Sequence, residues 1–412
     1  MRSRGAAMKI VIAALQRLSA NGICAQAVVS ELVRRGHEVV WVCNHEFESH
    51  DRQDGVEFRE IDPRWVDVAL ARHPGRSAAH TAIVAANRFG MLRSLGTWPL
   101  VSKGYSRRVT RAVCEACVGA DIVVGAYTQI DALIAAHEAK SRNPRLHYIA
   151  WFLDSFVGGY GPRFLSAKQL EERVGRWDRE LLDNADVVVS MESARCFHMD
   201  RCVNEPWFEK MRFLDLPLLD LHRMVDCSDD PGTPKGVKTI VYAGSLPKGI
   251  RSPRFFLNVL SCMPEEPLRV VFVGDAANDD LNAAASSDRR IEIRGRLSHG
   301  DAVALLRSAD FVLTLGNRLD NMTPSKVFEL MALRKPILAT YPIDDEPSMP
   351  YLKRYGDVLL LDERSDASEA ATKLRDFLRM SHEPPTVEEL EKNFWNNTPS
   401  AFCDLIELLG DK

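Results

Sequence analysis

Residues 316–339 read GNRLDNMTPSKVFELMALRKPILA and come directly after an apolar run at 311–315. The run is typical of a buried strand. The pair Thr323-Pro324 predicts a helix start, because Thr is a frequent N-cap and Pro is favoured at the first helical position. We expect the helix to extend to Leu333 and a second strand to follow it. A strand, a helix and a strand in succession are the repeating unit of a parallel α/β sheet.

Glu329 stands out within this helix because the other residues from Val327 to Leu333 are all apolar. They cover most of the helix circumference, which predicts a buried helix, and a carboxylate placed there needs hydrogen-bond partners. Ser325 lies one turn earlier on the same face. The two side chains, below a helix N-terminus, suit a ligand that carries both hydroxyls and negative charge. The alternative is a structural Glu that pairs with a nearby Arg.

A second loop of similar character follows the predicted strand at 239–243. It carries Lys248 and Arg251, and Ser252 is expected to cap the next helix. Both helix starts follow strands of one predicted sheet, so both should lie at its carboxyl edge, with Lys326 beside them. Three cations and two sets of exposed helical N–H groups favour a diphosphate ligand. The alternative is two ordinary caps with surface lysines.

Residues 323–329, Thr-Pro-Ser-Lys-Val-Phe-Glu, with the Met-Ala and Lys-Pro-Ile that follow, identify a resemblance. They resemble the donor-site motif of retaining glycosyltransferases with the two-domain GT-B fold, in particular the bacterial group called glycosyltransferase family four. The resemblance is strong over 239–340 and weaker over the rest of 8–410. It implies that Glu329 holds the ribose diol of a nucleotide-sugar. Many relatives have a second Glu, facing the transferred sugar, where this chain has Asn321.

The second loop matches the family pattern in part. Relatives have Gly-Arg and then Lys-Gly at the diphosphate, whereas this chain keeps Lys248 and has Ser245 where Arg is usual. We hypothesise that Arg251 takes the place of the missing Arg. Segment 294–297 resembles one whose backbone meets the nucleobase in relatives. The predicted site comprises catalytic Lys248, Arg251 and Glu329, and donor-binding Gly244, Ser245, Arg296, Asn321, Thr323, Pro324, Ser325 and Lys326.

The N-terminal half opens with a strand at 8–14, a loop containing Gly22, a helix at 23–34 and a strand at 38–42. This βαβ unit is of nucleotide-fold type, but the G-x-G-x-x-G fingerprint of dinucleotide binding is missing, which argues against an oxidoreductase. Segment 32–39 resembles the family pattern. Gly22 lets a ligand approach the backbone closely, with a plain tight turn as the alternative.

Asp154 follows another predicted strand, at 147–152, and precedes three glycines. Such loops are where open parallel sheets form active sites. We predict that Asp154 and Gly22 lie on the acceptor side, where Asp154 positions an acceptor hydroxyl; the alternative is that Asp154 caps a turn.

Residues 63–119 are predicted to be mainly helical and are unusually basic. Cations mixed with Trp and Leu suit peripheral contact with an anionic membrane, and the resemblance implies that this region meets the acceptor, a saccharide or a lipid-linked one. A solvated helix pair on a core is the alternative. The residues concerned are Arg88, Arg93, Lys103, Arg107, Arg108 and Arg111, interleaved with Phe89, Leu92, Leu95, Trp98 and Tyr105.

Strand and helix alternate again after the polar, breaker-rich segment at 227–236. The predicted fold class is therefore α/β, and the resemblance implies GT-B, two Rossmann-like doubly wound parallel sheets facing across a cleft. The predicted parts are an N-terminal acceptor-side domain (1–226), a linker (227–236), a donor domain (237–385) and C-terminal helices (386–412), the last crossing back to the first domain.

Composition fits an ordinary soluble protein: 412 residues, 27% charged, with a net charge of -4. This balance does not suggest a nucleic-acid partner, and no run approaches the ~18 apolar residues of a membrane span. Nine cysteines, an odd number, suggest reduced thiols in the cytosol. The pair Cys114 and Cys117 has no second pair at metal spacing, so no zinc site is expected. The N-terminus does not resemble a signal peptide.

We therefore predict a glycosyltransferase that is cytoplasmic, with the inner face of the cell membrane as the alternative location. The resemblance implies transfer with retention, without metal or cofactor, in cell-surface polysaccharide or glycolipid assembly. No Asp-x-Asp motif occurs, in agreement with metal independence. The alternative function is a nucleotide-sugar-binding scaffold that has lost catalysis, which Asn321 motivates.

Overall fold

A computed structural model describes residues 7–17, 19–45, 53–73, 77–127, 129–153, 165–221, 236–274, 278–319 and 324–411. Its contacts divide the chain into two compact units. Unit 1 comprises Met1–Pro217 and Pro399–Lys412, and unit 2 comprises Leu218–Thr398. The last segment of the chain therefore returns to the first unit. Of the predicted linker at 227–236, only Gly236 lies within the described residues.

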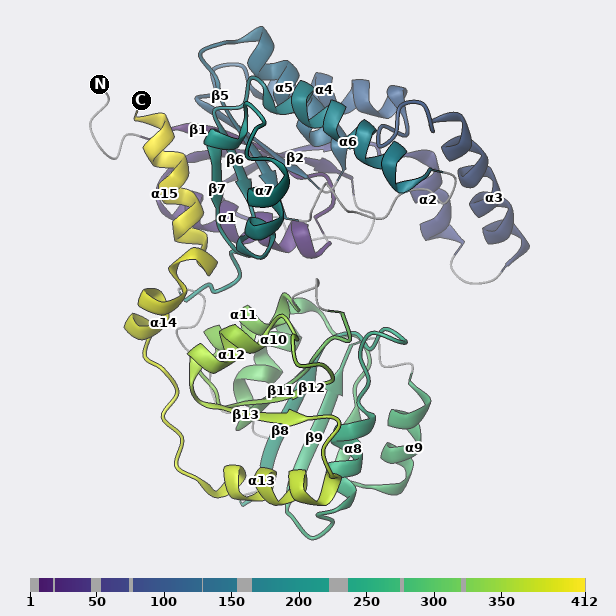
Figure 1. Ribbon diagram of the computed structural model, residues 1–412, viewed down its shortest axis with the longest axis vertical. Coiled ribbons are helices and arrows are strands. Elements are labelled where there is room, and N and C mark those ends of the chain that lie inside the picture. The colour runs from purple at the N-terminus through teal and green to yellow at the C-terminus, as the bar shows by residue number, and fades with distance from the viewer. Residues whose placement is uncertain are drawn as a thin grey trace. The chain divides into compact units, whose positions relative to one another are not determined.

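Unit 1 is built on a parallel sheet of seven strands in the order β3-β2-β1-β4-β5-β6-β7 (Figure 1). The order reverses between β1 and β4, which is the topological switch point of a doubly wound sheet. Its strands are β1 (Lys9–Ala13), β2 (Glu38–Asn44), β3 (Val56–Ile61), β4 (Ile122–Tyr127), β5 (His147–Phe152), β6 (Val187–Ser190) and β7 (Met211–Phe213).

Helices cover both faces of this sheet. On one face α4 and α5 pack together over Val11, Val40 and Val123, neighbours in register on three central strands. On the other face Phe402 of the last helix stacks on Trp151. The helices are α1 (Ala20–Arg34), α2 (Trp65–Arg72), α3 (Ala78–Arg93), α4 (Lys103–Ala116), α5 (Ile130–Arg142), α6 (Ala167–Leu182), α7 (Arg195–Arg201) and α15 (Pro399–Gly410).

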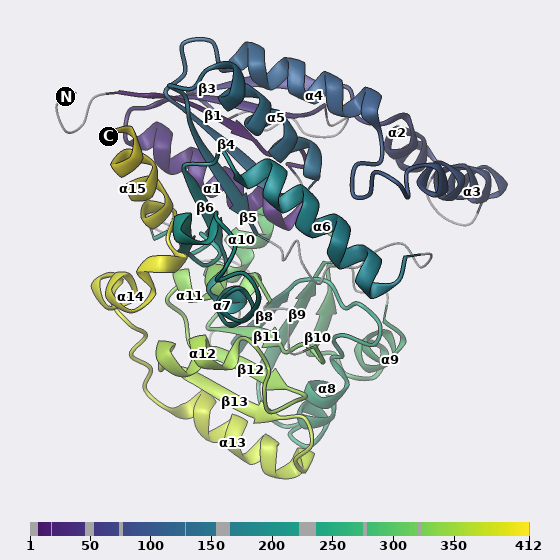
Figure 2. The ribbon, with the colours of Figure 1, turned by 45° about the horizontal axis from the view of Figure 1, so that its top comes forward.

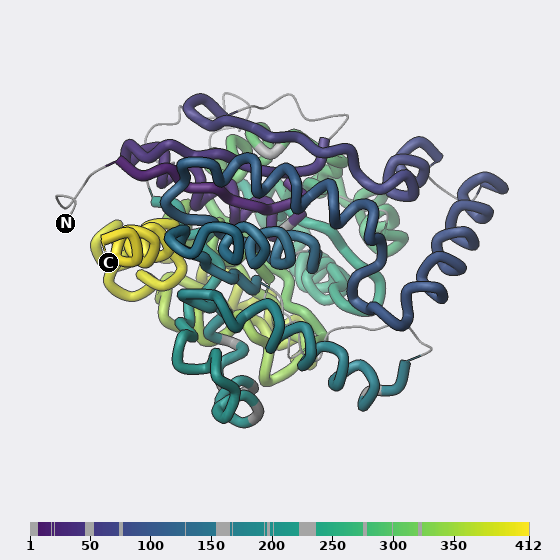
Figure 3. The backbone as a smooth tube through the Cα atoms, turned by 90° about the horizontal axis from the view of Figure 1, so that it is seen from above, coloured from purple at the N-terminus to yellow at the C-terminus, as the bar shows by residue number. Residues whose placement is uncertain are grey.

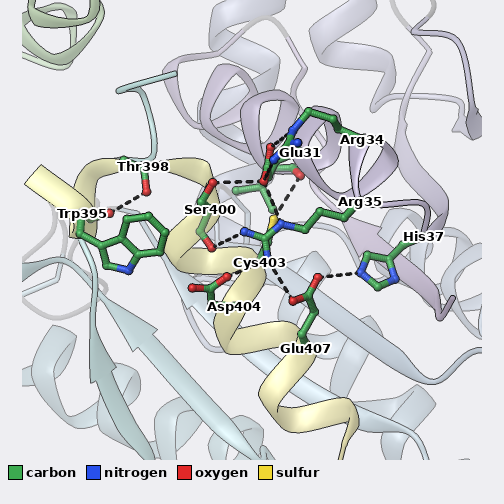
Figure 4. Close-up of polar contacts among 11 residues, drawn as sticks. Glu31, Arg34, Arg35, His37, Trp395, Thr398, Ser400, Cys403, Asp404 and Glu407 are labelled. Atoms are coloured by element: carbon green, nitrogen blue, oxygen red, sulfur yellow. Dashed lines mark hydrogen bonds and ion pairs between the residues drawn. The ribbon is translucent and has the colours of Figure 1, made fainter. Parts of the chain in front are cut away.

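A buried carboxylate joins α15 to α1 (Figure 4). Glu31 is 5% exposed and accepts hydrogen bonds from Arg34 and Arg35 at 2.6–2.8 Å and from the Ser400 hydroxyl at 3.1 Å. Arg35 also reaches Glu407 at 2.9 Å. Burial alone would raise the pKa of Glu31, but the bonds from Arg34 and Arg35 outweigh it and bring the pKa to about 2.

His37 extends the same network. The backbone N–H of Met8 donates to His37 Nδ1 at 3.3 Å, so Nδ1 is an acceptor and the ring proton sits on Nε2. Nε2 then donates to Glu407 at 3.0 Å. His37 therefore links the residue before β1 to the Glu407 carboxylate of α15 (Figure 4).

Unit 2 contains a six-stranded parallel sheet in the order β10-β9-β8-β11-β12-β13 (Figure 2). Helices α8 and α13 pack together over the face that carries Ile240, Phe272 and Leu313. The strands are β8 (Lys238–Ala243), β9 (Leu268–Val273), β10 (Ile291–Ile293), β11 (Phe311–Leu315), β12 (Ile337–Tyr341) and β13 (Val358–Asp362). The helices are α8 (Arg254–Ser261), α9 (Asp279–Ser287), α10 (His299–Ser308), α11 (Lys326–Ala332), α12 (Met349–Tyr355), α13 (Ala367–Arg379) and α14 (Val387–Phe394).

Several predicted helix starts are wrong by a few residues. Gly22 is not in a loop, because α1 begins at Ala20 and is capped by Ser19, whose hydroxyl accepts from the Gly22 N–H at 3.0 Å. Helix α8 has Pro253 as its N-cap, and α11 begins at Lys326 with Ser325 as its N-cap. Among the described residues no helix is long and apolar enough to cross a membrane.

Candidate functional site

Three glycines bring the ends of neighbouring strands together at the carboxyl edge of the sheet in unit 2. The N–H of Gly244, after β8, donates to Val273 at 2.9 Å, and the N–H of Gly274, after β9, donates to Gly295 at 2.7 Å. A Cβ on Gly274 would lie 2.1 Å from the Gly244 carbonyl oxygen, and its φ of 125° disfavours any side chain. Gly274 therefore permits the backbones of these two strand ends to lie against each other.

Arg251 is anchored beside these strand ends. Its Nε and Nη2 donate to Asn317 Oδ1 at 3.2 and 2.9 Å, and its Nη1 donates to the Ser245 carbonyl at 3.3 Å. Asn317 follows β11 and is 1% exposed. The guanidinium thus ties the loop after β8 to the end of β11, and most of its N–H groups already have protein acceptors.

Asn317 is held in turn by a buried acid that the sequence analysis missed. Glu346 accepts from the backbone N–H of Asn317 at 3.3 Å and from that of Ser348 at 2.9 Å, and the Ser348 hydroxyl also donates to it. Glu346 lies in a short polar segment, Asp-Asp-Glu-Pro, which has no periodicity and looks solvent-exposed in the sequence. Its burial reflects backbone donors that approach it only in the folded chain.

Lys248 differs from Arg251 in its surroundings. It is exposed in the turn before Gly249, whose φ is 82°. Its ammonium group makes no hydrogen bond or ion pair within the part of the chain that the structure describes. Of the two cations predicted in this loop, Lys248 is therefore the one whose charge is available to a ligand.

Glu329 lies on α11 with its side chain 16% exposed, although Val327, Phe328 and Leu330 around it are buried. Its Oε2 is 2.8 Å from the Lys326 ammonium, one turn earlier. The partner is thus a lysine of the predicted site and not the arginine of the structural alternative. The other carboxylate oxygen accepts no hydrogen bond from any described residue, so Glu329 retains acceptor capacity towards a diol.

The remaining predicted residues differ in exposure, and three of them are not described by the structure. Pro324 is buried at the start of α11, and Ser325 is half-buried, whereas Ser245 and Arg296 are exposed. On the predicted acceptor side, a Cβ on Gly22 would lie 2.1 Å from the Gln16 carbonyl oxygen, so this glycine permits a close approach by its own loop. Asn321, Thr323 and Asp154 lie outside the described residues.

The cysteines of the C-x-x-C pair are affected by burial. Burial raises the pKa of Cys117 to about 12 and also raises that of Cys114, which disfavours the thiolate form of both. The described ranges contain no group of three or more His, Cys, Asp or Glu side chains that could hold a metal ion.

A comparison with models of known families finds a match within unit 2. Residues 237–380 match the family model described as Glycosyl transferases group 1. This match spans the loops that carry Lys248, Arg251 and Glu329. The predicted resemblance to group 1 glycosyltransferases is thereby confirmed for this domain. No sequence among curated proteins matches the chain.

Solved structures match the chain over nearly its whole length. They include the N-terminal domain of Candida albicans trehalose-6-phosphate phosphatase, with a TM-score of 0.59, 14% identity and coverage of 97% of both chains. WaaG, a glycosyltransferase involved in lipopolysaccharide biosynthesis, matches with a TM-score of 0.55 and 12% identity. The match covers 96% of this chain and 99% of that one. The calicheamicin glycosyltransferase CalG4 matches with a TM-score of 0.51 and 16% identity, and the match covers 98% of both chains. Identities this low show the fold alone, and that fold is GT-B, as predicted.

Proposed function

We propose that the chain transfers a glycosyl group from a nucleotide-diphospho-sugar to a hydroxyl acceptor, with retention of configuration and without a metal. The observation that carries the proposal is the match of 237–380 to group 1 glycosyl transferases, at the sheet edge where Lys248 and Glu329 lie. Retention and metal independence rest on the resemblance of residues 323–329 to the donor motif of retaining enzymes.

The chemistry requires positive charge at the leaving group. Breaking the bond between the sugar and the diphosphate increases negative charge on the phosphate oxygens in the transition state. A fixed cation at that point lowers the barrier more than it stabilises the bound donor. The ammonium of Lys248, which is exposed and has no partner among the described residues, is suited to this role.

Arg251 has a different part in this proposal. Because Asn317 and the Ser245 carbonyl occupy most of its donors, we assign it to holding the loop that carries Lys248 in place. This modifies the hypothesis that it replaces the missing family Arg at the diphosphate. Only the N–H groups that these contacts do not use are available to a diphosphate.

Glu329 is assigned to the ribose of the donor. A carboxylate with one oxygen paired to Lys326 and the other open can accept hydrogen bonds from a vicinal diol. Lys326 orients the carboxylate, and Ser325 supplies a hydroxyl on the same turn of the chain. The nucleobase and the transferred sugar are not assigned.

The acceptor and the location are proposed from unit 1. Lys103, Arg107 and Arg111 follow one another at four-residue intervals along α4, line one hollow with Leu100 and make no ion pair in the described chain. Such a row of free cations suits the anionic inner face of a cell membrane. We propose a cytoplasmic protein in polysaccharide or glycolipid assembly that contacts this surface peripherally.

The apolar residues expected in this surface differ in exposure. Leu95 and Trp98 are half-buried, and the Trp98 carbonyl accepts from Trp177 Nε1 at 3.2 Å. Phe89 and Leu92 of α3 are exposed. The interfacial surface proposed here is therefore formed by α3 and by the outer face of α4.

The test of the function uses UDP-, GDP- and dTDP-sugars with the full-length protein. Calorimetry should detect binding of at least one donor, and slow release of its sugar to water should follow. Glu329→Ala should weaken donor binding by about 1.5–3 kcal/mol, since a charge-assisted hydrogen bond is lost. Lys248→Ala should lower turnover about a hundredfold with a smaller effect on binding.

Lys373→Ala on α13 is the matched control, because it removes an exposed lysine from the same unit away from this edge. Donor binding without any turnover, with or without acceptor, would favour the scaffold function. Absence of binding by every donor of the panel would rule out the proposed function.

A further inference from the structure

A hollow of about 500 Å³ opens in unit 1 between the loop after β3, helix α3 and the first turn of α4. All of its walls belong to unit 1, and its volume lies within the range of small-ligand sites. Its walls combine one exposed aromatic ring with several polar side chains. The residues that the argument uses are Asp62, Arg64, Trp65, Asn87, Tyr105 and Arg108.

Trp65 provides the aromatic surface of this hollow. It is the first residue of α2 and is 64% exposed, the second-largest exposure among the large apolar side chains described. An indole left in water sacrifices a large hydrophobic gain, so a partner that covers its face stabilises the complex. The apolar C–H face of a pyranose ring is such a partner, because it stacks flat on an aromatic ring while its hydroxyls point outwards.

Polar groups with unused hydrogen-bonding capacity surround the ring. The Asn87 amide and the Asp62 carboxylate make no hydrogen bond with any described residue. Arg108 uses Nη2 to donate to the Asp62 carbonyl at 3.2 Å and leaves its other N–H groups open. Donors and acceptors are thus both available, which matches hydroxyl groups, since each hydroxyl donates and accepts.

The charges of the hollow nearly cancel. Arg64 is paired to Asp67 through two hydrogen bonds of 2.8 Å, and the charge of Arg108 lies in the same hollow as the Asp62 carboxylate. A phosphate or a uronate would face this carboxylate without an excess of cations. The cation row on the outer face of α4 lines a different hollow. Neutral ligands are therefore favoured here over acidic ones.

We propose that this hollow binds a neutral saccharide ring of the acceptor, stacked on Trp65 and held by Asn87, Asp62 and Arg108. The inference rests on the proposed function for its biological meaning, because it assigns the acceptor's class. Binding itself depends only on unit 1.

The experiment measures binding of neutral gluco-, galacto- and manno-oligosaccharides, and of their phosphorylated counterparts, to the full-length protein by saturation-transfer NMR and calorimetry. The parent protein should bind at least one neutral oligosaccharide. Trp65→Ala and Asn87→Ala should each weaken that binding about tenfold, which corresponds to one lost stacking or hydrogen-bonding contact. Trp395→Ala, which removes an indole that is 41% exposed in unit 2, should leave it unchanged.

Donor binding measured on the same samples separates this inference from the proposed function. Saccharide binding that responds to Trp65→Ala supports the hollow whether or not a nucleotide-sugar binds. Failure to bind any neutral oligosaccharide, binding of the phosphorylated ones alone, or equal binding by parent and Trp65→Ala would overturn the inference, even if donor binding is intact. Both substituted side chains lie at the surface of the hollow, so melting temperatures near the parent's should verify folding.

Discussion

Helices α15 and α3 belong to the same unit and differ in how they are held. Six residues of the twelve-residue α15 are buried, whereas none of the sixteen residues of α3 is. Phe402, Ile406 and Leu409 of α15 recur at helical spacing and form one apolar stripe. Ala85, Phe89 and Leu92 of α3 have the same spacing but are not buried, and α3 lies beside α2 beyond the end of α4 in every view (Figure 3). The two helices therefore differ in whether the sheet covers their apolar residues, and not in helix length or in the spacing of those residues.

Helices α15 and α3 also differ in how their charged residues are paired. The acids of α15 meet cations of α1, as the pair of Glu407 and Arg35 at 2.9 Å shows. Helix α3 contains Arg88 and Arg93 but no acidic residue, and Lys103, Arg107 and Arg111 of α4 make no ion pair with any described residue, although Glu115 and Glu138 line the same hollow. The unit thus satisfies the charges of α15 internally and leaves those of α3 and α4 for a partner outside it.

The largest effect is expected from removing the apolar anchor of α15. Phe402 is 2% exposed and its ring lies 4.3 Å from that of Trp151, centroid to centroid. Phe402→Ala should lower the stability of unit 1 by about 3–5 kcal/mol through the lost burial and the cavity left behind. Thermal unfolding measures this loss. A change within error of the parent would show that α15 is not docked on the sheet in solution.

The next effect concerns the free cations of α4. Replacing Lys103, Arg107 and Arg111 by Ser should weaken binding to anionic vesicles by about 3 kcal/mol, or roughly a hundredfold, at about 1 kcal/mol for each charge. Co-sedimentation at low and high salt measures it. Replacing Lys353, Lys373 and Lys392 of unit 2 changes the net charge equally and is the control. If the parent stays in the supernatant at low salt, these cations do not serve a membrane.

Replacing Glu31 tests the polar contacts between α1 and α15. In Glu31→Gln the charge-assisted bonds from Arg34 and Arg35 are lost while the side-chain shape is retained. The free energy of opening α15, measured by hydrogen exchange at residues 399–410, should fall by about 1.5–3 kcal/mol. Ser400→Ala, which removes one neutral bond of the same carboxylate, should cost less. Equal losses would show that the charge itself contributes nothing.

The difference in stability between the parent and Glu31→Gln should depend on pH. The pKa of Glu31 is lowered by its arginine partners from 4.5 to about 2 in the folded chain. Its ionised form therefore stabilises the fold fully above pH 4.5, and this contribution is lost as the pH falls from 4.5 towards about 2. The gap between parent and Glu31→Gln should shrink over that interval. A gap that stays constant from neutral pH to about pH 3 would contradict the lowered pKa.

Sequence periodicity was sufficient for the sheet elements but not for the contacts that join distant segments. The strand at 311–315 ends where predicted, because an apolar run buried on both faces leaves little choice. The seam of Glu31 with Ser400 was missed, because its two sides are 369 residues apart and each resembles a solvated helix face.

The candidate site shows the same limit. Lys248 and Glu329 were found because each departs from its local pattern, a cation in a glycine loop and an acid in an apolar helix. Asn317 and Glu346 carry no such mark, and the role of Arg251 changed once Asn317 was seen opposite it. A residue that functions by holding another is recognised from contacts, which a single sequence does not contain.

The smallest effect is expected on α3. Phe89 and Leu92 are 57% and 41% exposed, so the double replacement Phe89→Ser and Leu92→Ser should change the stability of unit 1 by no more than about 0.5 kcal/mol. The same variant should bind anionic vesicles more weakly at high salt, where charge is screened and apolar insertion supports what binding is left. Phe402→Ala provides the contrast, since one aromatic of the docked helix should cost several times more than two apolar residues of α3. A loss of stability comparable to that of Phe402→Ala would mean that protein covers α3 in solution. Measuring the molecular mass of the parent and of the variant in solution would then show whether a second copy of the chain covers it.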